Sequence, residues 1–133
     1  MFEKIDHIGV AVADLEKMIS FYQDKLGLEL KGIEEVAEQK VRVAFFPVGE
    51  SKIELLETTD PDGPVGKFIE KKGEGVHHVS LRVSDIEAEI SRLKEQGVVL
   101  LDEKPRYGAG GARIAFLHPK STGGVLIELC ERK

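Results

Sequence analysis

The chain repeats its own pattern, and this internal repeat constrains the fold more than any other feature. The segment His7 to Glu16 (HIGVAVADLE) recurs as His78 to Glu87 (HVSLRVSDIE), at an offset of 71 residues. The segment Ile53 to Glu57 recurs as Ile127 to Glu131 at an offset of 74 residues, because a short insertion lies near residues 118–124. We therefore predict two modules and a linker, covering about residues 1–58, 75–133 and 59–74.

Each module has the same predicted order of elements. Apolar residues alternate with small or polar ones over residues 5–12, which is typical of a half-buried strand. Asp14 and Asp85 then precede apolar stripes with helical spacing, which end at Gly27 and Gly97. Three β-rich runs follow each helix, at residues 28–36, 41–48 and 51–57, and at 98–103, 112–117 and 124–130. The order βαβββ, twice, predicts an α+β fold in which two tandem modules form a curved mixed sheet around a cavity.

The linker has its own signals. Residues 61–64 (PDGP) are typical of a turn, and the spacing of Val65, Phe68 and Ile69 predicts a short helix after it.

Composition excludes several classes of protein. With 133 residues and a net charge of −5, the chain lacks the basic surface that nucleic-acid binding requires. No apolar run approaches the ~20 residues of a membrane span, and no signal peptide is visible at the N-terminus. A single cysteine, Cys130, gives no internal disulfide. We expect a cytoplasmic protein with no nucleic-acid or membrane partner.

Four polar residues interrupt otherwise aliphatic strands. His7 and His78 occupy equivalent places in the two modules, as do Glu54 and Glu128. Strand alternation puts each of them on the face opposite its aliphatic neighbours. We expect the four side chains to meet in one concave sheet, where two imidazoles and two carboxylates suit a divalent metal such as Co, Ni, Mn, Fe or Zn.

Taken singly, each of these residues has a plainer interpretation. A lone histidine in a strand is more often structural, and a lone glutamate usually marks the solvated face of the strand. The repeat favours the metal site, because duplication followed by drift gives no structural reason to keep a carboxylate at this position in both halves. His77 should face away from His78, so we do not count it as a ligand.

The chain resembles the vicinal oxygen chelate superfamily over essentially its whole length, through its paired modules and the order His, Glu, His, Glu. Several segments also resemble the methylmalonyl-CoA epimerase family: IDHIGVAV at 5–12, KIELL at 52–56, GVHHV at 75–79, FLHPK at 116–120 and GGVLIEL at 123–129. This resemblance implies metal ligands at His7, Glu54, His78 and Glu128. Some family members carry glutamine at the place of Glu54.

The resemblance also implies a reaction. Its expected substrate is a CoA thioester, and (R)- and (S)-methylmalonyl-CoA would interconvert by proton abstraction at C2 through a metal-stabilised enolate. Glu128 is the expected catalytic base, and the protein is expected to be a homodimer. At least one family member has a second catalytic glutamate on the strand that here reads KVRVAF at residues 40–45. Because this strand has no carboxylate, the acid on the opposite face of the substrate stays open between another residue and a metal-bound water.

Two other functions fit the same fold. Glyoxalase I (lactoylglutathione lyase) has a similar ligand set, and only the His-His and His-Pro-Lys segments favour the epimerase over it. A metal-free binding or resistance protein is the second alternative, and the four retained ligand-type residues argue against it.

Overall fold

The computed structural model describes residues 1–132, which separate into two compact units. The N-terminal unit consists of residues 7–77, and the C-terminal unit consists of residues 1–6 and 78–132. Strands β1 (Phe2–Ala11) and β5 (Gly75–Val83) contribute residues to both units.

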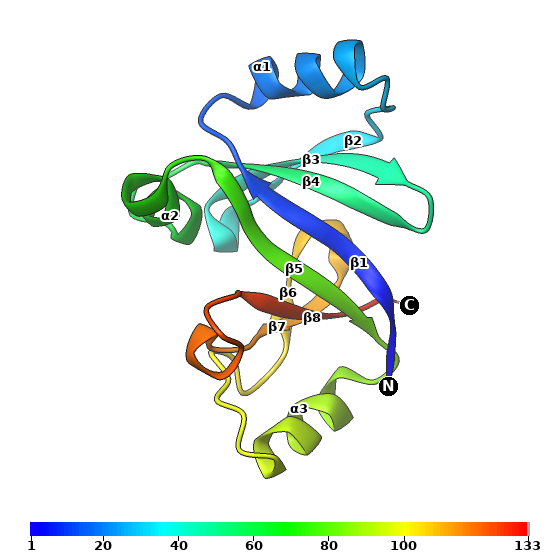
Figure 1. Ribbon diagram of the computed structural model, residues 1–133, viewed down its shortest axis with the longest axis vertical. Helices are drawn as coiled ribbons and strands as arrows, with labels where there is room; N and C mark the ends of the chain where they lie inside the picture. Colours follow the sequence, from blue (N-terminus) through cyan, green and yellow to red (C-terminus); the bar gives the residue numbers. More distant parts are fainter. Residues whose placement is uncertain (133) are drawn as a thin grey trace. The chain divides into compact units, whose positions relative to one another are not determined.

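The N-terminal unit has the predicted βαβββ order (Figure 1). After β1 its elements are helix α1 (Leu15–Ser20), the π-helical turn η1 (Phe21–Lys25), β2 (Gly32–Val36), the 3-10 turn η2 (Ala37–Gln39), β3 (Val41–Val48), β4 (Ser51–Thr58) and helix α2 (Pro64–Lys72). The strand order is β2-β3-β4-β1. Neighbouring strands run antiparallel except β4 and β1, which are parallel, so the sheet is mixed as predicted.

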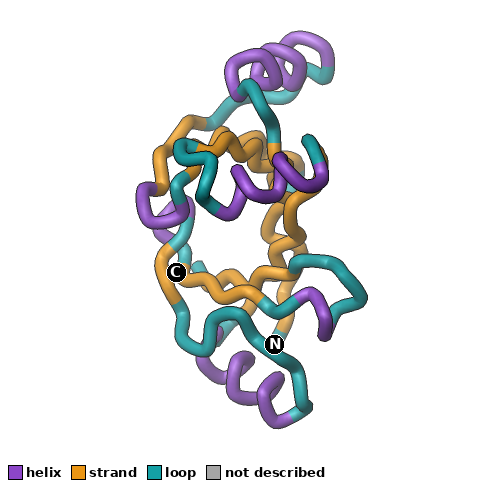
Figure 2. The backbone as a smooth tube through the Cα atoms, turned by 90° about the vertical axis from the view of Figure 1, so that its left-hand side faces the viewer, coloured by secondary structure: helices purple, strands orange, loops and turns teal. Residues whose placement is uncertain are grey.

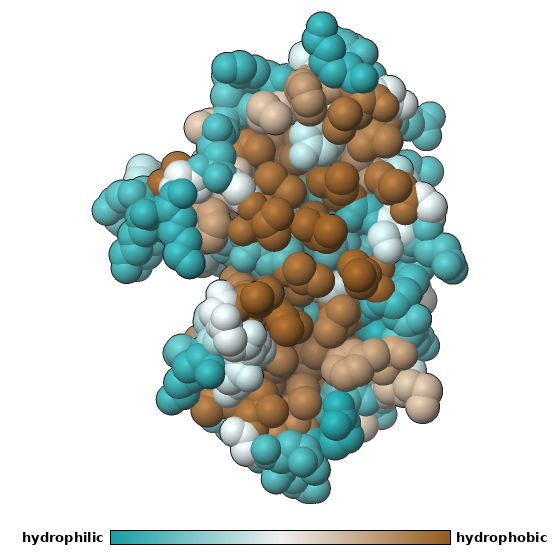
Figure 3. Space-filling model, in the orientation of Figure 1, coloured by the Kyte–Doolittle hydropathy of each residue, from teal (hydrophilic) through white to brown (hydrophobic). Residues whose placement is uncertain are grey.

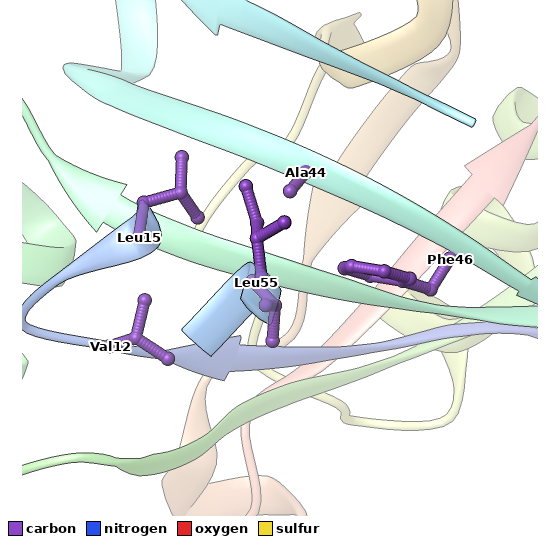
Figure 4. Packing of buried hydrophobic residues seen from close by; sticks show 6 residues of the cluster. Val12, Leu15, Ala44, Phe46 and Leu55 are labelled. Atoms are coloured by element: carbon purple, nitrogen blue, oxygen red, sulfur yellow. The ribbon is translucent and has the colours of Figure 1, made fainter. Parts of the chain in front are cut away.

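Helix α1 begins where the sequence predicts. The Asp14 carboxylate accepts a hydrogen bond from the Lys17 amide at 3.1 Å, which satisfies one of the free donors of the first turn. The helix covers one face of the sheet and buries an apolar cluster formed by Val12, Leu15, Ile19, Ala44, Phe46 and Leu55. Figure 4 shows these side chains packed together. The even-numbered residues of β3 thus face the helix, and its odd-numbered residues face the other way.

The C-terminal unit repeats the same plan. After β5 its elements are helix α3 (Ile86–Glu95), β6 (Arg106–Tyr107), the turn η3 (Ala109–Gly111), β7 (Arg113–Phe116), the turn η4 (Pro119–Ser121) and β8 (Ile127–Glu131). The strand order is β5-β8-β7-β6, with β5 and β8 parallel and the other pairs antiparallel. In each unit the helix lies against the strands, as Figure 2 shows.

The α3 helix and its sheet enclose the second core. Asp85 caps the helix by accepting from the Ala88 amide at 3.1 Å. Buried apolar residues from β5, α3, β7, β8 and the position directly after β7 pack together: Val83, Ile86, Ile90, Ala115, Leu117 and Leu129. Leu55 and Leu129, which match in the repeat, hold equivalent places in the two cores.

One predicted strand was wrong. Residues 98–103 form only an isolated bridge between Leu100 and Leu117, and the two-residue strand β6 follows instead. The Asp102 carboxylate accepts a hydrogen bond from the Phe116 amide at 2.9 Å, so a side chain replaces part of the strand ladder. The helix predicted to end at Gly27 also changes to π geometry after Ser20.

The predicted helix after the 61–64 turn is α2. Gly66 is required in it, because a Cβ there would lie 2.5 Å from the Pro61 carbonyl oxygen. Hydrophilic residues cover α2, at the left of Figure 3. Within residues 1–132, no helix is long and apolar enough to cross a membrane.

Candidate active site

The N-terminal unit places His7 beside Glu54. Strands β1 and β4 pair in parallel with Gly9 opposite Glu54, which brings the two side chains to the same face of the sheet. The His7 Nδ1 atom lies 3.3 Å from the Glu54 Oε2 atom, and both side chains are almost fully buried. Strand alternation predicted that each side chain lies on the face opposite its aliphatic neighbours, and the structure places both there.

A lysine borders this pair. The Lys52 Nζ atom lies 3.8 Å from Glu54 Oε2 and 5.7 Å from the centroid of the Phe45 ring. The ring and the ammonium are close enough for a cation–π interaction. Lys52 precedes Glu54 by two residues on β4, so alternation places both on one face.

Strand β3 itself carries no carboxylate, but Glu34 of the neighbouring strand β2 lies opposite Val43 and on the same face. Phe45 lies opposite Glu54, and Val43 lies opposite Leu56. Val43 and Leu56 are buried. The β3 residues beside Glu54 and Leu56 are therefore apolar, and the charge nearest Glu54 on its own strand is the Lys52 ammonium.

The C-terminal unit places His78 beside Glu128. The His78 Nε2 atom lies 4.0 Å from the Glu128 Oε1 atom, and both side chains are buried. The Phe116 ring stands edge-on to the His78 ring with centroids 5.6 Å apart, and Phe116 lies opposite Glu128 across β7 and β8. Ser80, fully buried, lies opposite Glu128 on β5.

Both pairs fit the chemistry of a divalent metal. Each pair offers one imidazole nitrogen and one carboxylate oxygen, donors that Zn, Co, Ni, Mn and Fe accept. Neighbouring donors on a metal with bonds of ~2.1 Å lie about 3.0 to 3.4 Å apart. The 3.3 Å separation of His7 and Glu54 meets this, and the 4.0 Å separation of His78 and Glu128 needs a small side-chain rotation.

The other histidines have different surroundings. The His77 ring stands edge-on to the Phe68 ring of α2, with centroids 5.0 Å apart. His118 accepts a hydrogen bond at Nδ1 from the Lys120 amide at 3.0 Å, which starts the turn η4. These contacts account for the positions of His77 and His118 without a metal ion.

A charged cluster next to this site was not predicted. The Asp6 carboxylate in the C-terminal unit is fully buried and accepts hydrogen bonds from Arg82 Nε at 2.6 Å and Arg132 Nε at 3.0 Å. Arg132 Nη1 also lies 3.5 Å from the Gly110 carbonyl oxygen, so the cluster contacts the glycine-rich turn η3. Alternation could have flagged Lys52, two residues before Glu54, but no sequence spacing links Asp6 to Arg132.

The thiol of Cys130, in the C-terminal unit, is unreactive. Burial raises the pKa of Cys130 to about 12, and the opposing effect of the Arg132 charge is smaller. A thiol with so high a pKa is not a nucleophile near neutral pH.

Comparison with known proteins identifies the family of this chain. Residues 6–116 match the sequence model of the glyoxalase/bleomycin resistance protein/dioxygenase superfamily. The mitochondrial methylmalonyl-CoA epimerase of Mus musculus is 41% identical over 127 residues, covering 95% of this chain and 71% of the mouse protein. The chain belongs to this superfamily and to its methylmalonyl-CoA epimerase family.

Two further proteins are similar to this chain over nearly its whole length. An uncharacterized Bacillus subtilis protein, YqjC, is 47% identical over 98% of this chain and 93% of its own length. A variant of the Streptomyces coelicolor methylmalonyl-CoA epimerase, in complex with 2-nitronate-propionyl-CoA, superposes with a TM-score of 0.95 at 41% identity. That superposition covers 98% of this chain and 95% of the Streptomyces chain.

Proposed function

We propose that the protein is a metal-dependent epimerase that interconverts (R)- and (S)-methylmalonyl-CoA. The observation that carries this proposal is the buried His–Glu pair in each unit, at positions that match in the repeat. Sequence drift after duplication gives no reason to keep two buried carboxylates at matching positions, since burying a charge costs several kcal/mol. The epimerase relatives, about 40% identical over nearly the whole chain, support this choice of substrate.

Neither pair is sufficient for a metal by itself, because a protein usually supplies three or four ligands to a catalytic ion. We therefore propose that His7, Glu54, His78 and Glu128 act together as one ligand set. The ion, when bound, supplies a Lewis acid for the charge that develops on the thioester oxygen.

Glu128 is the proposed base. Its carboxylate takes the proton from C2 of the substrate, and the electron pair of the C2–H bond moves toward the thioester carbonyl. A proton returned to the opposite face of C2 gives the other epimer. The Phe116 ring, which lies beside His78 and opposite Glu128, limits the access of water to these groups.

Deuterium incorporation tests this function. Incubation of the metal-loaded protein with (R)-methylmalonyl-CoA in D2O should give both epimers, with deuterium at C2, as mass spectrometry and NMR would measure. Assays with the hemithioacetal of methylglyoxal and glutathione would run in parallel. Activity on the hemithioacetal without deuterium at C2 would instead identify a glyoxalase, and no reaction with either compound would favour a binding protein.

Metal analysis tests the ligand set separately. Loss of a residue that only supports a metal ligand typically lowers metal affinity by about 10–100-fold. His7→Ala would remove a proposed ligand itself, so it should weaken metal binding by at least ~100-fold. Circular dichroism should show an intact fold. The matched control is His118→Ala, which removes a histidine outside the proposed set and should leave affinity unchanged; equal affinities in the two variants would remove His7 from the ligand set.

A homodimer is part of the same proposal, supported by the resemblance to the family. Analytical ultracentrifugation should show a species of twice the 14.7 kDa chain mass. A single species at the chain mass would overturn this point without affecting the reaction.

A further inference from the structure

We infer that Lys52 recognises the free carboxylate of the substrate and so makes the site selective for malonyl-type thioesters. The inference rests on the proposed function, and it goes beyond it by assigning a specificity-determining residue outside the ligand set. The position of Lys52 beside the His7–Glu54 pair carries it.

The surroundings of Lys52 show why its charge matters. Its ammonium lies 3.8 Å from Glu54 and 5.7 Å from the centroid of the Phe45 ring. The same sheet face presents the buried apolar residues Val43 and Leu56, and Glu34 lies opposite Val43 on β2. The Lys52 side chain is 21% exposed, so its end stays within reach of a ligand. A partly buried ammonium beside an aromatic ring is a strong partner for an incoming anion, because water competes with it less than at an exposed site.

The charge balance of the proposed site supports the same conclusion. Two neutral imidazoles, two carboxylates and one divalent ion sum to zero. The substrate then brings a further negative charge in its free carboxylate, which a desolvated site accommodates only with a matching cation. Lys52 is the cation closest to Glu54 on its strand face, and it supplies that charge.

Two thioesters that differ only in this carboxylate test the inference. Dissociation constants for methylmalonyl-CoA and propionyl-CoA would be measured by calorimetry on the metal-loaded protein, and their ratio reports recognition of the carboxylate. A charge-assisted hydrogen bond of about 1.5–3 kcal/mol corresponds to roughly 10- to 100-fold in affinity. Lys52→Met should therefore reduce the ratio by at least ~10-fold, by weakening methylmalonyl-CoA alone, while Lys52→Arg should keep most of it.

The control is Lys40→Met, which removes a lysine of the same unit that is ion-paired with Asp60. The ratio should not change in this variant. An unchanged ratio in Lys52→Met, or an equal loss of affinity for both thioesters, would overturn the inference. Lys52→Gln provides a second neutral variant should Lys52→Met fold poorly, and metal content would be measured in each.

Failure of this inference and failure of the proposed function are separable. If the wild-type protein puts deuterium into C2 but the ratio of dissociation constants is the same without Lys52, the epimerase function is supported and this role of Lys52 is overturned. If the ratio depends on Lys52 but no deuterium enters C2, Lys52 recognises the carboxylate in a protein that is not an epimerase.

Discussion

The two His–Glu pairs have the same residue types at matching positions, yet their surroundings differ. In the N-terminal unit, Glu54 has an ammonium 3.8 Å away. In the C-terminal unit, Glu128 lies opposite Phe116 and Ser80. The His78 imidazole is 4.0 Å from Glu128, whereas the His7 imidazole is 3.3 Å from Glu54. Glu54 is thus engaged by a cation and an imidazole, whereas Glu128 has neutral neighbours on both adjacent strands. The comparison shows that matching positions keep the same residue types in different surroundings, and the proposed roles follow this difference, with Glu128 as the proposed base.

The largest expected effect separates the two carboxylates. Glu128→Gln should lower turnover of methylmalonyl-CoA by about 10³-fold, since general base catalysis contributes 10²–10⁴-fold and an amide cannot take the proton. Glu54→Gln keeps an oxygen ligand and the shape of the side chain, so its loss should be closer to about 10-fold. Steady-state assays on both variants, with metal content measured beside them, would check this.

Similar losses in the two variants would break the comparison, because the carboxylates would then share one role. A larger loss in Glu54→Gln would reverse the assignment of the base. Glu57→Gln is a suitable control, since Glu57 is held by Arg42 and by the Leu15 amide.

Truncation of matching leucines in the two cores should lower the free energy of unfolding by similar amounts. Leu55 and Leu129 match in the repeat, and both are fully buried. Truncation to alanine removes the same group from each core, so Leu55→Ala and Leu129→Ala should each lower the free energy of unfolding by about 3 kcal/mol. Urea denaturation followed by circular dichroism would measure both values. A difference above about 2 kcal/mol would show that one core relaxes around the cavity far better than the other.

The matching cores also show what sequence can predict. Alternation and helical spacing located the helices, most strands and the orientation of His7, Glu54, His78 and Glu128, because each depends on local periodicity. The predicted strand at residues 98–103 failed, since a hydrogen bond from the Phe116 amide to the Asp102 side chain replaced part of a ladder there. The cluster of Asp6, Arg82 and Arg132 joins residues more than 70 positions apart, which no local pattern encodes.

A pH-dependent difference distinguishes the units at another repeat position. Cys130 matches Leu56, so only the C-terminal core holds a titrating group there. Burial raises the pKa of Cys130 from 9.0 to about 12, so the folded protein keeps a proton that the unfolded chain loses above pH 9. The contribution of this thiol to the free energy of unfolding is therefore fully present below pH 9. It falls as the pH rises, by about 1.4 kcal/mol at pH 10.

The control for this effect is Cys130→Ala, which removes the thiol and should flatten this part of the profile. The measurement is the free energy of unfolding of the metal-free protein between pH 8 and pH 10. Parallel profiles for the two proteins would show that the thiol does not contribute.

The smallest expected effect compares the two helix caps. Asp14 and Asp85 match in the repeat, and each accepts a hydrogen bond at 3.1 Å from the amide three residues later. Asp14→Ala and Asp85→Ala should each cost about 1 kcal/mol in the free energy of unfolding, because each exposes one amide of the first turn. Asn at either position should restore most of the loss, since its side-chain oxygen also caps. Because α1 changes to π geometry after Ser20 while α3 stays regular to Glu95, a smaller cost for Asp14→Ala would show that the shorter helix depends on packing more than on its cap.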